Sequence, residues 1–186
     1  MDPLPERLFH GTNERFAEFS REKSPKGFCF TPRFADALEW AEEQTALGGE
    51  PLVYEVKLDL GVDPLEVFAR RAHWSEIPSP FDKEEGEERE IDSLALDAEA
   101  RGYEGVIFRK VMDRPDTMDG KVTDTYFVFA PDQVEILAVH SGEALAAMVA
   151  AEETQAKAAK AALRKARGQA KATLLATGAT PISSHD

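Results

Sequence analysis

Side chains that could carry chemistry are spread thinly along this chain of 186 residues. His10 ends a short apolar stretch and is followed by Gly11, whose missing side chain would let a ligand approach the backbone closely. Cys29 is the single cysteine and lies within an aromatic stretch, residues 27–31. Trp40 follows one predicted helix later and could be a core residue or a stacking surface. Each of these residues alone is equally compatible with a purely structural role.

Hydrophobic periodicity predicts the elements that must position these residues. Alternating apolar residues favour strands, and a period near 3.6 residues favours helices. We expect strands at residues 8–10, 26–31, 52–60, 106–108, 125–130 and 134–139, and helices at residues 32–41 and 93–101. Gly102 is suited to ending the second helix.

Two segments are too polar or too rich in turn-forming residues to form part of a core. Residues 78–92 hold seven acidic and two basic side chains, and residues 113–120 are rich in aspartate, proline and glycine. We interpret both as loops.

The C-terminal part of the chain differs in composition from the rest. Residues 141–176 predict an alanine-rich helix, of which residues 157–171 carry six basic side chains and no acidic one, and residues 177–186 predict a disordered tail. The helix could pack on the acidic body, serve as a tail for a partner, or be a solvated appendage. Residues 1–140 are then a separate domain.

The chain has a net charge of -13, and its acidic excess lies in this domain, because residues 1–140 carry 16 basic and 31 acidic side chains. Such a surface repels phosphate backbones, so nucleic-acid binding is disfavoured. One cysteine and four scattered histidines, with no CxxC pair, indicate neither a disulfide framework nor a metal site. No apolar run approaches the roughly 18 residues of a membrane helix, and no secretory signal begins the sequence. We therefore expect a cytoplasmic protein with no membrane partner.

The order of the segments resembles the ADP-ribosyltransferase superfamily over roughly residues 8–140, in particular the domains of this kind in phage polyvalent proteins and in poly(ADP-ribose) polymerases. The segments that carry the resemblance are Leu8-Phe-His-Gly-Thr12, Gly27-Phe-Cys-Phe-Thr31, the helix ending at Trp40, Val53-Tyr-Glu-Val-Lys57, Arg101-Gly-Tyr-Glu-Gly-Val-Ile107, and Asp124-Thr-Tyr-Phe-Val-Phe-Ala-Pro-Asp-Gln-Val134. The resemblance implies an α+β fold with a split, mixed or antiparallel β-sheet and flanking helices, to which the C-terminal helix is added. It also implies NAD as the substrate.

This family carries a histidine, a tyrosine and a glutamate on three separate strands. His10 matches the histidine, which hydrogen-bonds the adenosine-side ribose, and Gly11 matches the glycine whose backbone holds the nicotinamide carboxamide. Cys29 occupies the tyrosine position, so stacking on nicotinamide is assigned to Trp40 or to an aromatic neighbour of Cys29. The set implied to bind NAD is His10, Gly11, Thr12, Phe28, Cys29, Phe30, Thr31 and Trp40.

The glutamate position implies Asp124 as the catalytic carboxylate, acting with His10 to stabilise the cationic state as nicotinamide departs. The alternative for Asp124 is a strand-entry cap, and Asp119 and Glu135 are reserve candidates. Val122 stands where relatives that modify arginine carry a second glutamate, which disfavours arginine modification by that arrangement. The loop at residues 111–123 would recognise the acceptor.

The resemblance thus implies an enzyme of the glycosyltransferase class: a mono-ADP-ribosyltransferase that cleaves NAD and modifies a macromolecule. The acceptor would be a host protein, and the transferase a phage or bacterial effector in the host cytoplasm. The alternatives are an NAD glycohydrolase, in which water is the acceptor, and an inactive acidic binding module. A tRNA 2′-phosphotransferase is disfavoured, because it needs a basic cleft.

Overall fold

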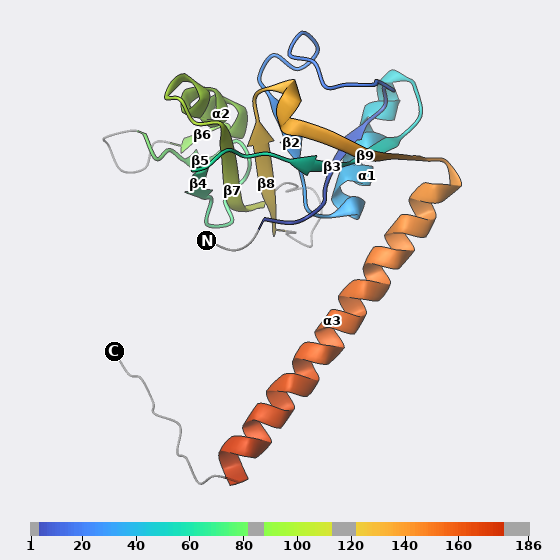
Figure 1. The fold of residues 1–186 in the computed structure, drawn as a ribbon, viewed down its shortest axis with the longest axis vertical. Helices are drawn as coiled ribbons and strands as arrows, with labels where there is room; N and C mark the ends of the chain where they lie inside the picture. The colour runs from blue at the N-terminus through green and yellow to red at the C-terminus, as the bar shows by residue number, and fades with distance from the viewer. Residues whose placement is uncertain (1–3, 82–87, 113–121, 177–186) are drawn as a thin grey trace. The chain divides into compact units, whose positions relative to one another are not determined.

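The computed structural model describes residues 4–81, 88–112 and 122–176 (Figure 1). The chain divides into two compact units, Met1–Ala146 and Ala147–Asp186. The first unit holds every strand, and the second holds most of one long helix.

The strands of the first unit are β1 Leu8–Thr12, β2 Phe28–Phe30, β3 Leu52–Leu58, β4 Leu65–Phe68, β5 Ile77–Pro78, β6 Glu88–Arg89, β7 Gly105–Met112, β8 Val122–Val128 and β9 Val134–Ser141. The α-helices are α1 Phe34–Gln44, α2 Ile91–Ala100 and α3 Glu143–Ala176, with short 3-10 turns η1 Thr45–Leu47 and η2 Pro131–Gln133.

Two sheets form the framework of the domain. One is antiparallel with strand order β1-β3-β9, and the other has order β2-β8-β7-β4, in which only the β4–β7 pair is parallel. A bridge between Phe9 and Thr31 joins the sheets through backbone hydrogen bonds of 2.8 and 2.9 Å. The predicted α+β fold with a split, mixed sheet is confirmed.

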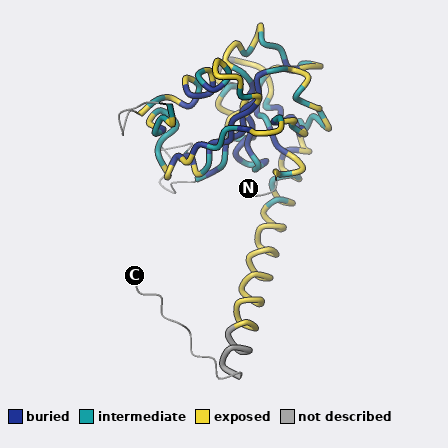
Figure 2. Tube along the Cα trace, turned by 60° about the vertical axis from the view of Figure 1, so that its left-hand side comes forward, coloured by how far each residue is buried: buried dark blue, intermediate teal, exposed yellow. Residues whose placement is uncertain are grey.

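Burial explains how the helices cover these sheets. In α1, the side chains of Phe34, Ala37 and Ala41 are buried on one face, at the spacing expected of a helix that packs on a sheet. In α2, Leu94, Ala95 and Ala98 do the same over the second sheet. Figure 2 shows the resulting buried interior of the first unit, which consists of two apolar clusters.

Most predicted elements are present, but four features were not expected, one of which is β5. Strand β4 was not expected, because Leu65–Phe68 is short and lacks clean alternation. The predicted loop at residues 78–92 contains β6, whose Arg89 pairs with Ile77, and the start of α2 at Ile91. Residues 82–87 of that loop, the turn-rich loop at 113–120 and the predicted tail at 177–186 lie outside the described residues.

The second unit is helical. The described side chains from 153 to 170 are all exposed, including Leu163 at 54%. Among the described residues no helix has the length and apolar character needed to cross a membrane.

Candidate active site

A cleft of about 330 Å³ opens where β1, β2, α1 and β8 meet, beside the start of α2. Its lining is mainly apolar and aromatic, with a few polar groups, as is typical of small-molecule sites. The lining residues are Phe9, His10, Gly11, Cys29, Phe30, Thr31, Ala37, Trp40, Gln44, Trp74, Ile91, Asp92, Thr125 and Phe127.

Gly11 determines how closely α1 lies against β1. A Cβ atom at this position would lie 1.8 Å from the carbonyl oxygen of Ala37 and 2.9 Å from the backbone nitrogen of Ala41. The space above Gly11 is therefore taken by the backbone of α1, which sets Trp40 on the wall of the cleft at 36% exposure. A flat indole at such a position can stack on an aromatic ring.

His10 has a defined hydrogen-bonding state. Its Nδ1 lies 2.9 Å from the carbonyl oxygen of Cys29, and because a carbonyl only accepts, Nδ1 carries the proton. Burial lowers the pKa of His10 below its usual value of 6.5, against the opposing effect of this hydrogen bond. The imidazole is therefore neutral at pH 7, and its Nε2 is a hydrogen-bond acceptor. Phe19 and Phe30 pack around the ring at centroid distances of 5.2 and 5.7 Å.

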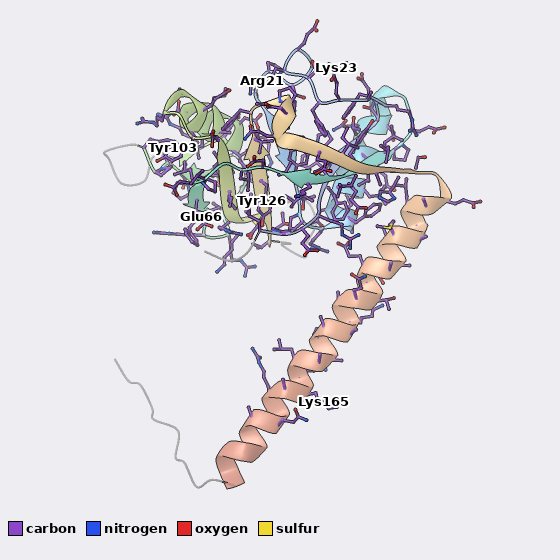
Figure 3. The ribbon with its side chains drawn as sticks, viewed as in Figure 1. Arg21, Lys23, Glu66, Tyr103, Tyr126 and Lys165 are labelled. Carbon is purple, nitrogen blue, oxygen red and sulfur yellow. The ribbon has the colours of Figure 1, made fainter. Side chains whose placement is uncertain are left out.

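A second, more polar hollow of about 400 Å³ shares His10 and Gln44 with the cleft. Its lining comes mostly from the loop between β1 and β2 and includes Thr12 and Lys23, which is labelled in Figure 3. Lys23 Nζ donates to Glu14 at 2.7 Å, and this partner raises the pKa of Lys23. His10 thus stands at the junction of an aromatic hollow and a polar one.

Strand β8 presents different chemistry on its two faces. Thr125 and Phe127 line the cleft, whereas the residues between and before them contact Arg109 of β7. Arg109 donates to Asp124 at 2.7 Å, to the hydroxyl of Tyr126 at 3.3 Å and to Glu66 of β4 at 2.7 Å. We call Arg109, Glu66, Asp124 and Tyr126 the arginine network; Figure 3 labels Glu66 and Tyr126.

The arginine network has a structural cause in β7. The register of β7 against β8 shifts between Phe108 and Val111, and Lys110 adopts a positive φ of 59° at this bulge. The Asp124 carboxylate accepts the Lys110 backbone N–H at 2.9 Å. Burial alone lowers the pKa of Arg109, but hydrogen bonds to Glu66 and Asp124 outweigh it and raise that pKa. Asp124 is thus a partner of an ion pair and of a bulge, and it does not line the cleft.

Asp92 was not singled out in the sequence, although it lines the cleft. It lies in the first turn of α2 and is the one carboxylate among the described lining residues. Lys26 donates to it at 2.9 Å, and the two side chains are 56% and 36% exposed. The residues around Asp92 predict a charged loop from the sequence. Its position in the cleft became apparent only from the structure, in which α2 begins at Ile91. A further hollow of about 260 Å³ shares Asp92, Cys29 and Phe127 with the cleft.

The structure brings together six of the eight residues predicted to bind NAD: His10, Gly11, Cys29, Phe30, Thr31 and Trp40 line the cleft. Thr12 lies in the neighbouring polar hollow, and Phe28 is in the apolar core at 2% exposure. Glu135 is exposed on β9, away from the cleft lining, and Asp119 lies outside the described residues. The described part of the chain holds no cluster of three or more potential metal ligands.

A family model described as ADP-ribosyltransferase in polyvalent proteins matches residues 2–143. The match includes the nine strands of the described residues and every lining residue named for the cleft. No curated protein and no solved structure matches the chain.

Proposed function

Since the chain belongs to the ADP-ribosyltransferase family of polyvalent proteins, we propose that it is a mono-ADP-ribosyltransferase that cleaves NAD and modifies a macromolecule. The observation that carries this proposal is the position and tautomer of His10 between two hollows of unlike polarity. NAD is a two-part molecule, with a flat, positively charged nicotinamide ring at one end and an anionic pyrophosphate with adenosine at the other.

The aromatic cleft suits the nicotinamide end. Trp40 offers a ring face on one wall, and Gly11 and Phe30 limit the width of the site. A stacked aromatic pair typically contributes about 1 kcal/mol beyond the burial of its surface. Cys29 adds a small polarizable side chain where the family carries tyrosine.

The polar hollow suits the pyrophosphate and adenosine end. Lys23 is a cation that phosphate can recruit from its surface partner Glu14, and the hydroxyl residues Ser20 and Ser24 line the same hollow. At the junction, the acceptor Nε2 of His10 would take a hydrogen bond from a ribose hydroxyl. A neutral histidine suits this task better than an imidazolium, which has no acceptor.

In the proposed reaction, the bond between nicotinamide and the ribose C1 carbon breaks, and nicotinamide leaves with the bonding electrons. An acceptor nucleophile then bonds to C1. His10 is proposed to orient the substrate. Asp124 is predicted from the sequence to stabilise the cationic ribose, but it pairs with Arg109 and does not line the cleft, so that role stays a prediction from the sequence alone. A preorganised carboxylate is expected to stabilise the cationic ribose by about 3 kcal/mol, by analogy with oxyanion-hole donors.

We further propose that the acceptor is a host protein that a phage or bacterial effector meets in the host cytoplasm. The charge of the first unit favours this, because residues 1–140 carry an excess of acidic groups that attracts basic protein surfaces and repels nucleic acid. NAD is proposed to be the substrate without help from a metal ion.

The proposal is tested by incubating the protein with NAD and a cell lysate, and following nicotinamide and protein-bound ADP-ribose by mass spectrometry. We expect labelled protein with the wild type and at least a tenfold loss with His10→Ala. The matched control is His140→Gln, because His140 lies on β9 outside the cleft, where its Nε2 pairs with Glu55. Equal activity of the wild type and His10→Ala would refute the proposal.

Two alternative functions can be distinguished from the transferase by their products. Free ADP-ribose without labelled protein would identify an NAD glycohydrolase, which the open cleft also permits. The hydroxyl and aromatic side chains that β8 turns to the cleft, together with Cys29, favour an inactive binding module. Saturable NAD binding without nicotinamide release would identify this second alternative.

A further inference from the structure

The hollow of about 260 Å³ that adjoins the cleft is here called the third hollow, and Asp92 lies at the junction between the two. Three residues line both spaces: Cys29, Asp92 and Phe127. The third hollow is otherwise lined by Ser24, Pro25, Lys26 and Gly27, which precede β2. It meets the polar hollow at Ser24, which lines both, but it adjoins the cleft through other residues than His10 and Gln44, which the polar hollow shares with the cleft.

We propose that the third hollow is the acceptor subsite and that Asp92 is the general base that receives the proton of the attacking nucleophile. This inference rests on the proposed function, because it needs NAD in the cleft. With the nicotinamide end beside Trp40 and the pyrophosphate end beyond His10, the third hollow is the remaining approach to the cleft among the described hollows.

Three features suit Asp92 to this role. It is the one carboxylate in the cleft lining of the described residues, whereas Asp124 is held in the arginine network. Its position in the first turn of α2 places it where the cleft and the third hollow meet, since it lines both. Its partner, Lys26, is more than half exposed on the solvent side, so it can yield the carboxylate to an incoming N–H or O–H group.

The atoms balance without a further reactant. The glycosidic bond breaks, and nicotinamide leaves as a neutral molecule with the electron pair. The nucleophile bonds to C1 and loses its proton to an oxygen of Asp92, which later releases that proton to solvent. A general base of this kind typically contributes a factor of about 100 to 10,000 in rate.

Asp92→Asn is the direct test, with Asp97→Asn as the matched control. Asp97 lies on the same helix, pairs with Arg89 at 2.7 Å and is 40% exposed, but it lines neither hollow. We expect Asp92→Asn to bind NAD within about twofold of the wild type and to lose about 100-fold in protein labelling, the step in which the nucleophile gives up its proton. Asp97→Asn should keep both NAD binding and protein labelling.

Chemical rescue separates a base from a structural role. Added formate should restore part of the activity of Asp92→Ala, because a small carboxylate can enter the space left by the side chain, and it should not restore Asp124→Ala. Full activity of Asp92→Asn, or loss and formate rescue confined to Asp124, overturns the assignment of Asp92. A wild type that binds no NAD, or binds it without nicotinamide release, instead overturns the proposed function and this inference with it.

Discussion

The two faces of strand β8 differ in both chemistry and role. The face toward the cleft carries hydroxyl and aromatic side chains, Thr125 and Phe127, whereas the opposite face carries Asp124 and Tyr126 within the arginine network. Successive side chains of a strand point to opposite faces of the sheet. Neighbouring residues of β8 therefore differ in role: one can contact a ligand in the cleft, and the next can stabilise the fold. An acidic residue can therefore lie close to the expected position in the sequence and still point away from the site, as Asp124 does.

The largest expected effect is a loss of stability when the arginine network on the far face of β8 is disrupted. Arg109→Leu removes the shared partner of Glu66 and Asp124 and leaves both carboxylates without their cation in a partly buried place. We expect unfolding to become easier by about 3 kcal/mol, measured by urea denaturation. The affinity for NAD, measured on the folded protein, should stay within about twofold, since Arg109 does not line the cleft. A large loss of affinity with intact stability would contradict the division between the faces.

The next largest expected effect is a loss of affinity for NAD when Trp40 is removed from the wall of the cleft. Trp40→Ala removes an exposed ring from the cleft, and we expect the affinity for NAD to fall about tenfold, since stacking on an aromatic side chain contributes about 1–3 kcal/mol per base. Thermal stability should change little because Trp40 is 36% exposed. Phe68→Ala on β4, 59% exposed and outside the cleft, is the matched control and should leave the affinity unchanged.

Acid should weaken NAD binding through His10. Burial lowers the pKa of His10 below 6.5, so the neutral acceptor form persists at pH 7 and is lost as the pH falls below 6.5 through the lowered pKa. Folding stability from this group follows the same direction, because the unfolded chain binds the proton at a higher pH. A pH titration of NAD affinity should show the decline in the wild type, and His10→Asn should remove it. Affinity that rises on acidification would be inconsistent with Nε2 as an acceptor.

The smallest expected effect is a modest loss of affinity for NAD when the hydroxyl of Thr125 is removed from the face of β8 that lines the cleft. Thr125→Val keeps the volume of a side chain that is 5% exposed and removes its hydroxyl from the cleft. We expect the affinity for NAD to fall by a factor equivalent to about 1 kcal/mol, the usual net contribution of one hydrogen bond. Thr125→Ser should restore it. If both variants bind as the wild type does, the hydroxyl makes no contact with NAD.

The sequence predicts the α+β fold and most of the cleft, because the signals involved are local or carried by the resemblance. Leu8-Phe-His-Gly-Thr12 and the helix that carries Trp40 lie beside one another, although this helix ends at Gln44 and not near Trp40. The reason for Gly11 differs in part from the expectation. The close approach that it permits is that of the α1 backbone, which no local pattern reveals.

The remaining parts depend on long-range pairing that one sequence does not display. Strand β4 is recognisable only from its parallel pairing with β7. The role of Asp124 depends on which way one residue of β8 points and on a bulge in β7. Asp92 enters the cleft because α2 begins at Ile91, two residues before its predicted start. The catalytic assignment of Asp124 stays a prediction.

Calorimetric titration of NAD into the wild type and into Asp124→Asn tests the central claim most directly. We expect one saturable site in both proteins, with affinities for NAD within about twofold of each other. Only the stability of the variant should be lower, because Asp124 belongs to the arginine network. No saturable binding to the wild type, or loss of binding in a folded Asp124→Asn variant, would contradict it.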